Sequence, residues 1–344
     1  MGPTAHTLRK STTGPIEAVA QDSNLAAWFT SSTQACDQVH VLAPGKKDRS
    51  FPQPSSSSIT CHWDLTDGQQ QLAIAGRMST ALWTLHESGP APFDYVLAAP
   101  FGGPERQIDR LAHANDGTGK WLEGVVGSGR TLAYSWDDVE YVDKLACLSG
   151  GSCKQKIADG GIRLVTRTGD QPQPLPGVGP ALQLAASAGR LAYIPATIVK
   201  AGRPTANTNN SLYVVDAASG DLEGKAFVHG IPLAISLSPN VLTVLTTQTG
   251  PHDRISWFSA TGEKKLGSVL VSPRAAPQLA SSDQLIVFRV NRLLYGVSTH
   301  GGRPRLLAKT AQDSIGLSLA HGRLVWADNR DDVGRLRTVS VSAR

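Results

Sequence analysis

The chain has 344 residues, of which 40% are hydrophobic and 18% are charged, and this composition excludes an intrinsically disordered protein. The net charge of +5 comes from basic residues scattered along the chain, so no basic patch predicts a nucleic-acid partner. No apolar run approaches the roughly 18 residues of a transmembrane helix, so we expect no membrane span.

The N-terminal segment carries no apolar signal core in residues 1–6. Either the protein is cytosolic, or a leader was trimmed before this numbering begins. A short strand is predicted over residues 5–10, ahead of the first repeat described below.

An apolar run with an aromatic or β-branched residue recurs seven times along the chain. If these residues are equivalent, successive repeats lie 55, 51, 59, 51, 43 and 39 residues apart. Periods of this size are typical of β-propellers, in which each period forms one blade. The seven residues are Trp28, Trp83, Tyr134, Tyr193, Val244, Val287 and Trp326.

The segments around each run predict a unit of four strands. A strand of small residues precedes the run, as in residues 182–186, and suits the inner strand where blades converge on the axis. A third strand follows, such as residues 211–216, and leads into a Gly-containing turn that is typical of a hairpin. A more polar fourth strand, such as residues 303–309, ends the unit.

We therefore predict an all-β fold, a seven-bladed β-propeller of four-stranded antiparallel blades in one domain over residues 1–344. Six or eight blades, or two stacked sandwiches, are the alternatives. The predicted blades cover approximately residues 14–54, 70–110, 123–178, 180–229, 230–272, 275–312, and 314–344 together with 4–11.

The two ends of the chain predict how the ring closes. The seventh unit stops after its third strand, residues 335–341, whereas the spare strand at residues 5–10 precedes the first unit. The spacing from Trp326 through the two ends to Trp28 is 46 residues, which fits the series. We expect the N-terminal strand to complete the last blade and to cover an edge that would otherwise invite aggregation.

Two segments resemble the TolB-like, or WD40-like (PD40), β-propeller repeats of bacterial proteins. They are Ser238-Pro239-Asn240 at the start of the fifth blade, and Leu212-Tyr213-Val214-Val215-Asp216 with its Gly turn in the fourth. The resemblance spans most of the chain, although the family's Ser-Pro-Asp-Gly is intact nowhere in it. It implies a propeller fold and a general interaction role, and it names no substrate.

The four cysteines lie in predicted loops. Cys147 and Cys153 bracket five residues of blade three, Cys36 precedes the third strand of blade one, and Cys61 lies in the connection to blade two. In a propeller, the connection from the second to the third strand and the connection between blades emerge on the same face, so Cys36 and Cys61 are able to meet. We expect two disulfides and an extracellular, periplasmic or cell-surface location. Free thiols or a metal site are the alternatives, but no Cys-x₂-Cys knuckle occurs.

Long insertions in blades one to four predict a binding surface, because a rigid scaffold presents loops for recognition. The insertions cover residues 50–67, 111–123, 135–160 and 196–210. Aromatic and charged residues within them suit contact with a protein or a carbohydrate, although the tryptophans have the alternative of packing between blades. The candidate binding residues are Trp63, Asp64, Lys120, Trp121, Trp136, Asp137, Asp138 and Tyr141.

Motifs of catalysis are absent from the sequence, including Gly-x-Ser-x-Gly, His-Glu-x-x-His and a phosphate-binding glycine loop. We therefore expect no catalytic residue, no metal and no cofactor. The first hypothesis is a monomeric extracytoplasmic module that presents the upper loops of blades one to four to a protein or glycan. The alternative is a propeller enzyme, a hydrolase or lyase, with its site at the mouth of the central channel.

Overall fold

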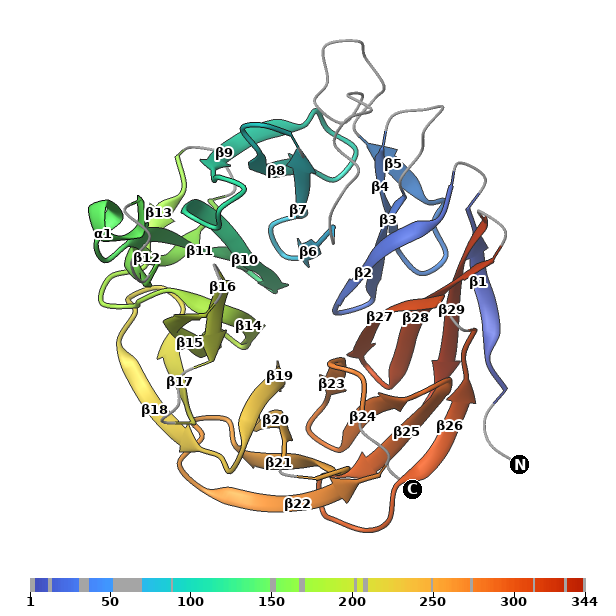
Figure 1. Ribbon diagram of the computed structural model, residues 1–344. Helices are drawn as coiled ribbons and strands as arrows, with labels where there is room; N and C mark the ends of the chain where they lie inside the picture. Colours follow the sequence, from blue (N-terminus) through green and yellow to red (C-terminus); the bar gives the residue numbers. More distant parts are fainter. Residues whose placement is uncertain are drawn as a thin grey trace.

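A computed structural model describes residues 4–11, 14–30, 37–51, 70–87, 89–148, 153–166, 171–200, 203–206, 210–248, 250–272, 275–311, 313–330 and 333–342. Seven antiparallel sheets surround a central axis, which confirms the predicted seven-bladed β-propeller (Figure 1). Within these ranges the one helix is α1 (Lys144–Leu148). No helix in the described part of the chain is long and apolar enough to cross a membrane.

Each blade contains four strands that follow one another outward from the axis, and blade four carries one additional strand. Blade one contains β2 (Ile16–Asp22), β3 (Leu25–Thr30), β4 (Gln38–Leu42) and β5 (Arg49–Phe51), and blade two contains β6 (Leu72–Ala75), β7 (Thr80–Glu87), β8 (Phe93–Pro100) and β9 (Arg106–Ala112). Blade three contains β10 (Gly119–Ser128), β11 (Thr131–Tyr141), β12 (Gln155–Leu164) and β13 (Gln173–Pro174). Blade four contains β14 (Ala181–Ser187), β15 (Arg190–Lys200), β17 (Ser211–Asp216) and β18 (Leu222–Phe227), and β16 (Arg203–Ala206) is its additional strand. Blade five contains β19 (Ile231–Leu237), β20 (Val241–Thr247), β21 (Asp253–Ser259) and β22 (Lys265–Val271). Blade six contains β23 (Leu279–Ser281), β24 (Leu285–Val290), β25 (Leu293–Ser298) and β26 (Arg305–Lys309). Blade seven contains β27 (Asp313–Ala320), β28 (Arg323–Arg330) and β29 (Val333–Ser340), and β1 (His6–Lys10) completes it.

Tight turns join the first and second strands of each blade. In blade four, Ala188 and Gly189 have φ of 51° and 80°, and in blade seven His321 and Gly322 have φ of 49° and 69°. Two successive residues with positive φ are typical of the type I′ turn, whose twist matches that of the flanking strands. These turns all lie on one face of the ring, here called the lower face. The connections from second to third strand, and from one blade to the next, lie on the opposite, upper face.

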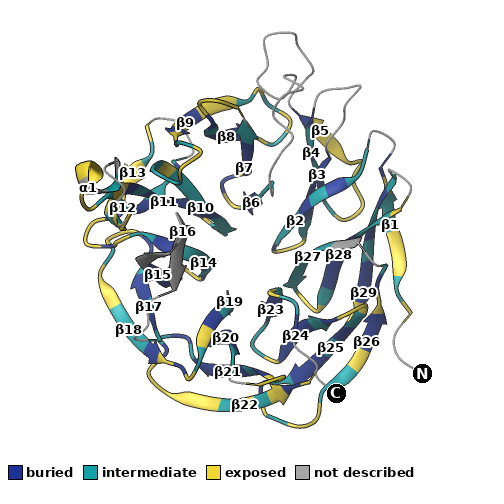
Figure 2. Ribbon diagram, viewed as in Figure 1, coloured by how far each residue is buried: buried dark blue, intermediate teal, exposed yellow. Residues whose placement is uncertain are grey.

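The hydrophobic core is divided into seven layers, one between each pair of neighbouring blades. Phe29 and Phe51 of blade one, for example, pack with Trp83 of blade two. Figure 2 shows burial concentrated on the second and third strands, whereas most residues of outer strands such as β18 and β22 are intermediate or exposed. Each blade therefore depends on both neighbours for the burial of its apolar side chains. Burial of one large apolar side chain stabilises the fold by roughly 1.5–3 kcal/mol.

The seven residues that mark the sequence repeat all lie on the second strand of a blade. These strands are β3, β7, β11, β15, β20, β24 and β28. The second strand is buried on both faces by the neighbouring blades, which explains why its sequence is the most uniformly apolar of the four.

The ring closes as predicted, through the N-terminal strand. β1 pairs antiparallel with β29, from His6 opposite Thr338 to Lys10 opposite Arg335. Blade seven also binds blade one directly, because the side-chain amide of Asn329 accepts from Ile16 N at 3.0 Å and donates to Ile16 O at 2.9 Å. The two ends of the chain thus complete one blade together.

Candidate functional site

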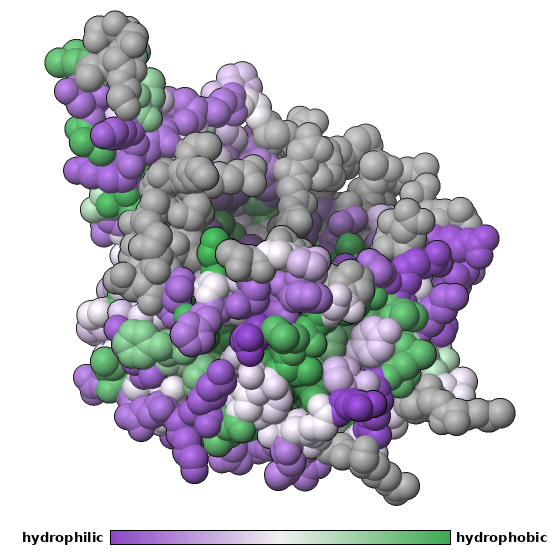
Figure 3. All heavy atoms as spheres, turned by 60° about the horizontal axis from the view of Figure 1, so that its bottom comes forward, coloured by the Kyte–Doolittle hydropathy of each residue, from purple (hydrophilic) through white to green (hydrophobic). Residues whose placement is uncertain are grey.

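Two long hairpins raise the upper face of blades three and four above the ring. In blade three, β11 continues to Tyr141 and remains paired with β12 as far as Gln155. In blade four, β15 pairs with β17 only as far as Tyr193 and then continues to pair with β16. Much of the predicted insertions at residues 135–160 and 196–210 is therefore strand, because the ladders extend beyond the ring. In Figure 3, where the face toward the reader in Figure 1 points upward, blade three stands above the ring at the left.

The described residues among the predicted binding set lie together on this raised part of blade three. Lys120 and Trp121 are the second and third residues of β10 and lie opposite Asp138 and Asp137 of β11. Tyr141 ends β11 and donates its hydroxyl to Asp116 Oδ2 at 3.1 Å, although that contact is exposed to solvent. The ladder therefore gathers residues that the sequence assigned to two separate loops.

Two of the predicted binding residues, Trp63 and Asp64, lie outside the described residues, as do Cys36 and Cys61. Cys147 and Cys153 are joined by a disulfide, with their Cα atoms 4.5 Å apart. This bond confirms the predicted disulfide for that pair and closes the tip of the blade-three hairpin beside α1.

Trp136 lies at the base of the raised hairpin and is only 7% exposed. Its ring packs in the layer between blades two and three, which is the alternative that the sequence left open for the tryptophans. The guanidinium of Arg163 lies 4.5 Å from the ring centroid, and Lys120 Nζ lies 5.3 Å from it. Both cations are within the range of an attractive cation–π contact.

A hollow of about 410 Å³ lies beside Trp136 and Arg163, along the outer side of β12. The fourth strand of this blade, β13, pairs only with Arg163 and Leu164. Above them, the outer edge of β12 has no strand partner within the described part of the chain. A Cβ atom at Gly160 would lie 2.7 Å from Trp136 O, so the strand passes the tryptophan at a distance that only glycine permits.

Asp109 on β9 fixes the position of Arg163, one of the side chains that line this hollow. Its Oδ2 accepts a hydrogen bond from the Tyr134 hydroxyl at 2.6 Å and another from the Arg163 guanidinium. Burial and then the Asp109 carboxylate raise the pKa of Tyr134 above its ordinary value. The contacts join blade two to two strands of blade three and fix the guanidinium beneath Trp136.

Asp137 is a fully buried carboxyl group in the same hairpin. It lies between Trp121 of β10 and Gly160 of β12 in the ladder. Burial raises the pKa of Asp137 to about 7, the charge of Asp138 adds to this effect, and a contact with Glu123 opposes it. Its charge therefore changes near neutral pH, whereas an exposed aspartate is ionised throughout that range.

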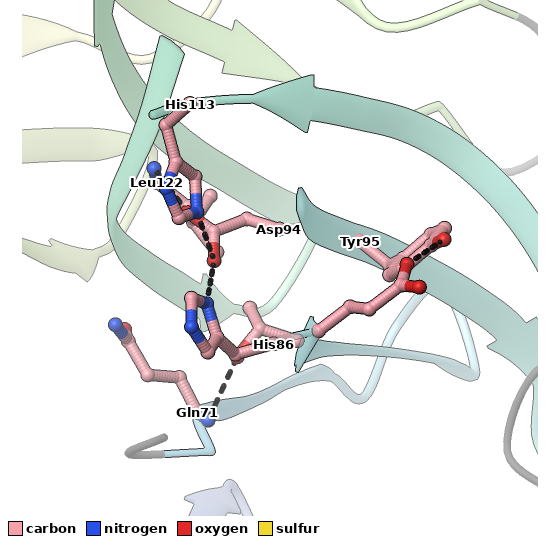
Figure 4. Close-up of polar contacts among 8 residues, drawn as sticks. Gln71, His86, Asp94, Tyr95, His113 and Leu122 are labelled. Carbon is pink, nitrogen blue, oxygen red and sulfur yellow. Dashed lines mark hydrogen bonds and ion pairs between the residues drawn. The ribbon is translucent and has the colours of Figure 1, made fainter. Parts of the chain in front are cut away.

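Two histidines and an aspartate meet at the upper edge of the boundary between blades two and three (Figure 4). Asp94 on β8 lies opposite His86 on β7, and His113 bridges to Gly119 at the start of β10. Asp94 Oδ1 is 2.7 Å from His86 Nδ1 and 3.6 Å from His113 Nε2. In the described residues this is the one group of three His, Cys, Asp or Glu side chains whose ligand atoms lie within 4.8 Å of one another.

Two residues of β10 contact this group, one at the Asp94 carboxylate and one at the His113 ring. Leu122 N donates to Asp94 Oδ2 at 3.0 Å, and the Trp121 ring stacks on His113 with centroids 3.7 Å apart. Burial raises the pKa of Asp94, but the contacts with His113, His86 and Leu122 outweigh it and hold the pKa below its ordinary range. An ionised carboxylate thus lies between two imidazole rings.

The sequence did not reveal this group. Its members come from a second strand, a third strand and an inter-blade connection, and their spacing matches no ligand motif. The one signal nearby is Trp121, a predicted binding residue whose ring stacks on His113.

The central channel forms a cavity of about 1060 Å³ that opens at the lower face among the first turns of the blades. Asp22 Oδ2 accepts from Gly76 N at 2.6 Å and Gly129 N at 2.8 Å, and Asp283 Oδ1 accepts from Asn240 N at 2.9 Å. Asp22 thus joins the first turn of blade one to those of blades two and three, and Asp283 joins the first turn of blade six to that of blade five. In the part of the chain that the structure describes, no group of three possible metal ligands lies in the channel.

The closed ring of seven four-stranded antiparallel blades defines a seven-bladed β-propeller. No protein-family model matches the sequence, and no curated protein matches it. Among solved structures, a chain of a mitotic checkpoint complex is 12% identical, covering 99% of this chain and 93% of that chain with a TM-score of 0.56. The β-propeller domain of Myceliophteria thermophila Cps50 (Swd1) is 12% identical, covering 98% and 100% with a TM-score of 0.54. Saccharomyces cerevisiae Sqt1 is 10% identical, covering 99% and 100% with a TM-score of 0.49. At 12% identity, the likeness to the checkpoint-complex chain and to Cps50 shows the fold alone.

Proposed function

We propose that this chain is an extracytoplasmic binding module that presents the upper face of blades one to four to a protein or glycan partner. The observation that carries the proposal is the raised hairpin of blade three, with a hollow at its base beside an edge of β12 that has no strand partner among the described residues. An extended peptide is able to add to such an edge through its backbone while one of its side chains enters the hollow. This geometry favours a protein partner over a glycan.

The extracytoplasmic location is supported by the disulfide between Cys147 and Cys153, because such bonds persist in oxidising compartments. A relationship to the bacterial TolB-like repeats is proposed on the segments that resemble them. In the fold, Ser238-Pro239-Asn240 forms the first turn of blade five, where Ser238 Oγ donates to Asp283 Oδ1 at 2.8 Å.

The binding surface is tested by affinity capture from the native extract with the full-length protein as bait. Lys120→Glu combined with Tyr141→Ala changes two side chains on the upper face of blade three. Arg130→Glu combined with His300→Ala makes matched changes at exposed turns of the lower face. We expect the upper-face variant to recover at least about tenfold less of the partners that both other proteins recover, since lost contacts of about 1.4 kcal/mol have that effect. Equal recovery by all three proteins would show that the partner binds elsewhere.

A further inference from the structure

We propose that His86, Asp94 and His113 bind one divalent transition-metal ion, with zinc as the preferred occupant. The group offers two imidazole nitrogens and one carboxylate oxygen. Two histidines and one carboxylate, with a fourth position left for water, are a donor set that zinc accepts in proteins. The site is separate from the proposed binding hollow and does not depend on that proposal.

The state of His113 is the observation that points to a ligand. Its side chain is only 1% exposed, and neither ring nitrogen has a hydrogen-bond partner. Buried polar groups are nearly always paired, because leaving one without a partner is costly. The Nε2 atom of His113 faces Asp94 Oδ1 (Figure 4). A metal ion between them would use the imidazole lone pair and the carboxylate charge together.

The distances suit a small ion. Tetrahedral zinc, with bonds of about 2.0–2.1 Å, separates its ligand atoms by roughly 3.3 Å. The two separations from Asp94 Oδ1, 2.7 Å to His86 and 3.6 Å to His113, lie on either side of that value. His86 is the most exposed of the three, at 26% of its side chain, and its ring stacks on that of His113 with centroids 5.2 Å apart.

Neighbouring groups hold Asp94 and His113 in place. Leu122 N holds the second oxygen of Asp94, and so leaves Oδ1 facing the two rings. The Trp121 ring fixes the plane of His113 by stacking, and its own Nε1 donates to Gly117 O at 3.2 Å. Outer contacts of this kind orient metal ligands and raise affinity. Leu122, Trp121 and the segment that carries His113 belong to blade three and the connection leading to it, so a bound ion would link that connection to blade two.

The experiment is a titration of full-length protein, prepared without a histidine tag, with Zn²⁺ and with Co²⁺. We expect one ion per chain, a Co²⁺ absorption spectrum of tetrahedral type, and a Tm that rises with Zn²⁺ concentration, because the ion binds only the folded chain. His86→Ala and Asp94→Asn each remove one ligand, and we expect each to weaken zinc binding at least about tenfold. His300→Ala, an exposed histidine on the lower face, is the matched control and should bind like the wild type.

Several outcomes would overturn the site. They are equal zinc affinity in the wild type, His86→Ala and Asp94→Asn, an equal loss in His300→Ala, or a Co²⁺ spectrum of octahedral type. The far-UV circular dichroism and the cooperative thermal unfolding of His86→Ala in metal-free buffer show whether that variant is folded, so that a loss of binding is distinguished from a loss of folding. His113→Ala, checked for its far-UV circular dichroism, repeats the test at the buried ligand.

Discussion

Three aspartates near the boundary between blades two and three show how strongly environment decides the state of one residue type. Asp94 accepts from Leu122 N and lies against two imidazole rings, and these contacts hold its pKa below the ordinary range. Asp109 accepts from Tyr134 and Arg163 and so forms part of the structure. Asp137 is buried next to the charge of Asp138, and its pKa is raised to about 7. Composition and spacing do not distinguish these three states, because the causes are contacts with other strands.

Asp137 should make the stability of the protein depend on pH between about 4 and 7. Its folded-state pKa lies above the value of 3.8 for an unperturbed aspartate, so burial disfavours the charged form. The penalty is absent below about pH 4, grows as the unfolded chain alone releases its proton, and is complete above about pH 7. Asp137→Asn removes it. We therefore expect the unfolding free energy of the variant, relative to wild type, to rise by about 2–4 kcal/mol from pH 4 to pH 8.

Urea denaturation at a series of pH values measures this difference. Asp159→Asn, at an exposed aspartate of β12, is the control for the same chemical substitution outside the buried position. A constant difference for Asp137→Asn would contradict the prediction, because it would mean that the pKa of Asp137 is the same in the folded and the unfolded chain.

At the scale of elements, the raised hairpin of β11 and β12 distinguishes blade three from the blades of the opposite side. β11 has 11 residues and β12 has 10, whereas β24 and β25 of blade six have 6 each. The hairpin stands outside the inter-blade layers over much of its length, as the exposed and half-exposed residues of β12 show. Its tip therefore depends on its own ladder and on the disulfide.

Replacing Cys147 and Cys153 by serine should loosen this tip without unfolding the ring. The bond closes a short loop, with a sequence separation of 6, and its loss should cost about 2 kcal/mol of local stability. We expect amide hydrogen exchange in residues 141–155 to accelerate by at least about tenfold, while the Tm falls by less than about 3 °C, because the opening is local. A large fall in Tm would contradict this, since it would mean that the tip supports the blades.

At the scale of the whole molecule, stability depends on closure of the ring. Each apolar layer lies between two blades, and the layer between blades seven and one contains Trp28, Val325 and Leu336. Its two sides come from opposite ends of the chain. Leu8 of β1 packs against the same layer, so the N-terminal strand contributes both hydrogen bonds and apolar contact to the closing blade.

Deletion of residues 1–12 should therefore lower the stability of the entire ring. The edge of β29 would lose its partner, and the closing layer would lose part of its cover. We expect the Tm to fall by more than about 10 °C, and the truncated protein to associate through the open edge. Differential scanning calorimetry and size-exclusion chromatography measure the two effects. Deletion of residues 1–3, which precede β1, is the control. An unchanged Tm after the longer deletion would mean that β1 is dispensable for closure.

The sequence by itself determined the blade count, the order of strands within a blade and the way the ring closes. Those properties follow from local causes, because the recurring apolar runs, the hairpin turns and a missing final strand are all visible along one chain. The disulfide of blade three was also predictable, since its two cysteines are close in sequence.

The tertiary structure alone decided which polar side chains meet. A register shift in the β10–β11 ladder between Leu122 and Gly124 accompanies the pairing of Trp121 with Asp137. The group of His86, Asp94 and His113 depends on a pairing within blade two and on the path of the connection to blade three. Register shifts and inter-blade contacts arise from packing between distant segments, so no pattern along the sequence specifies them.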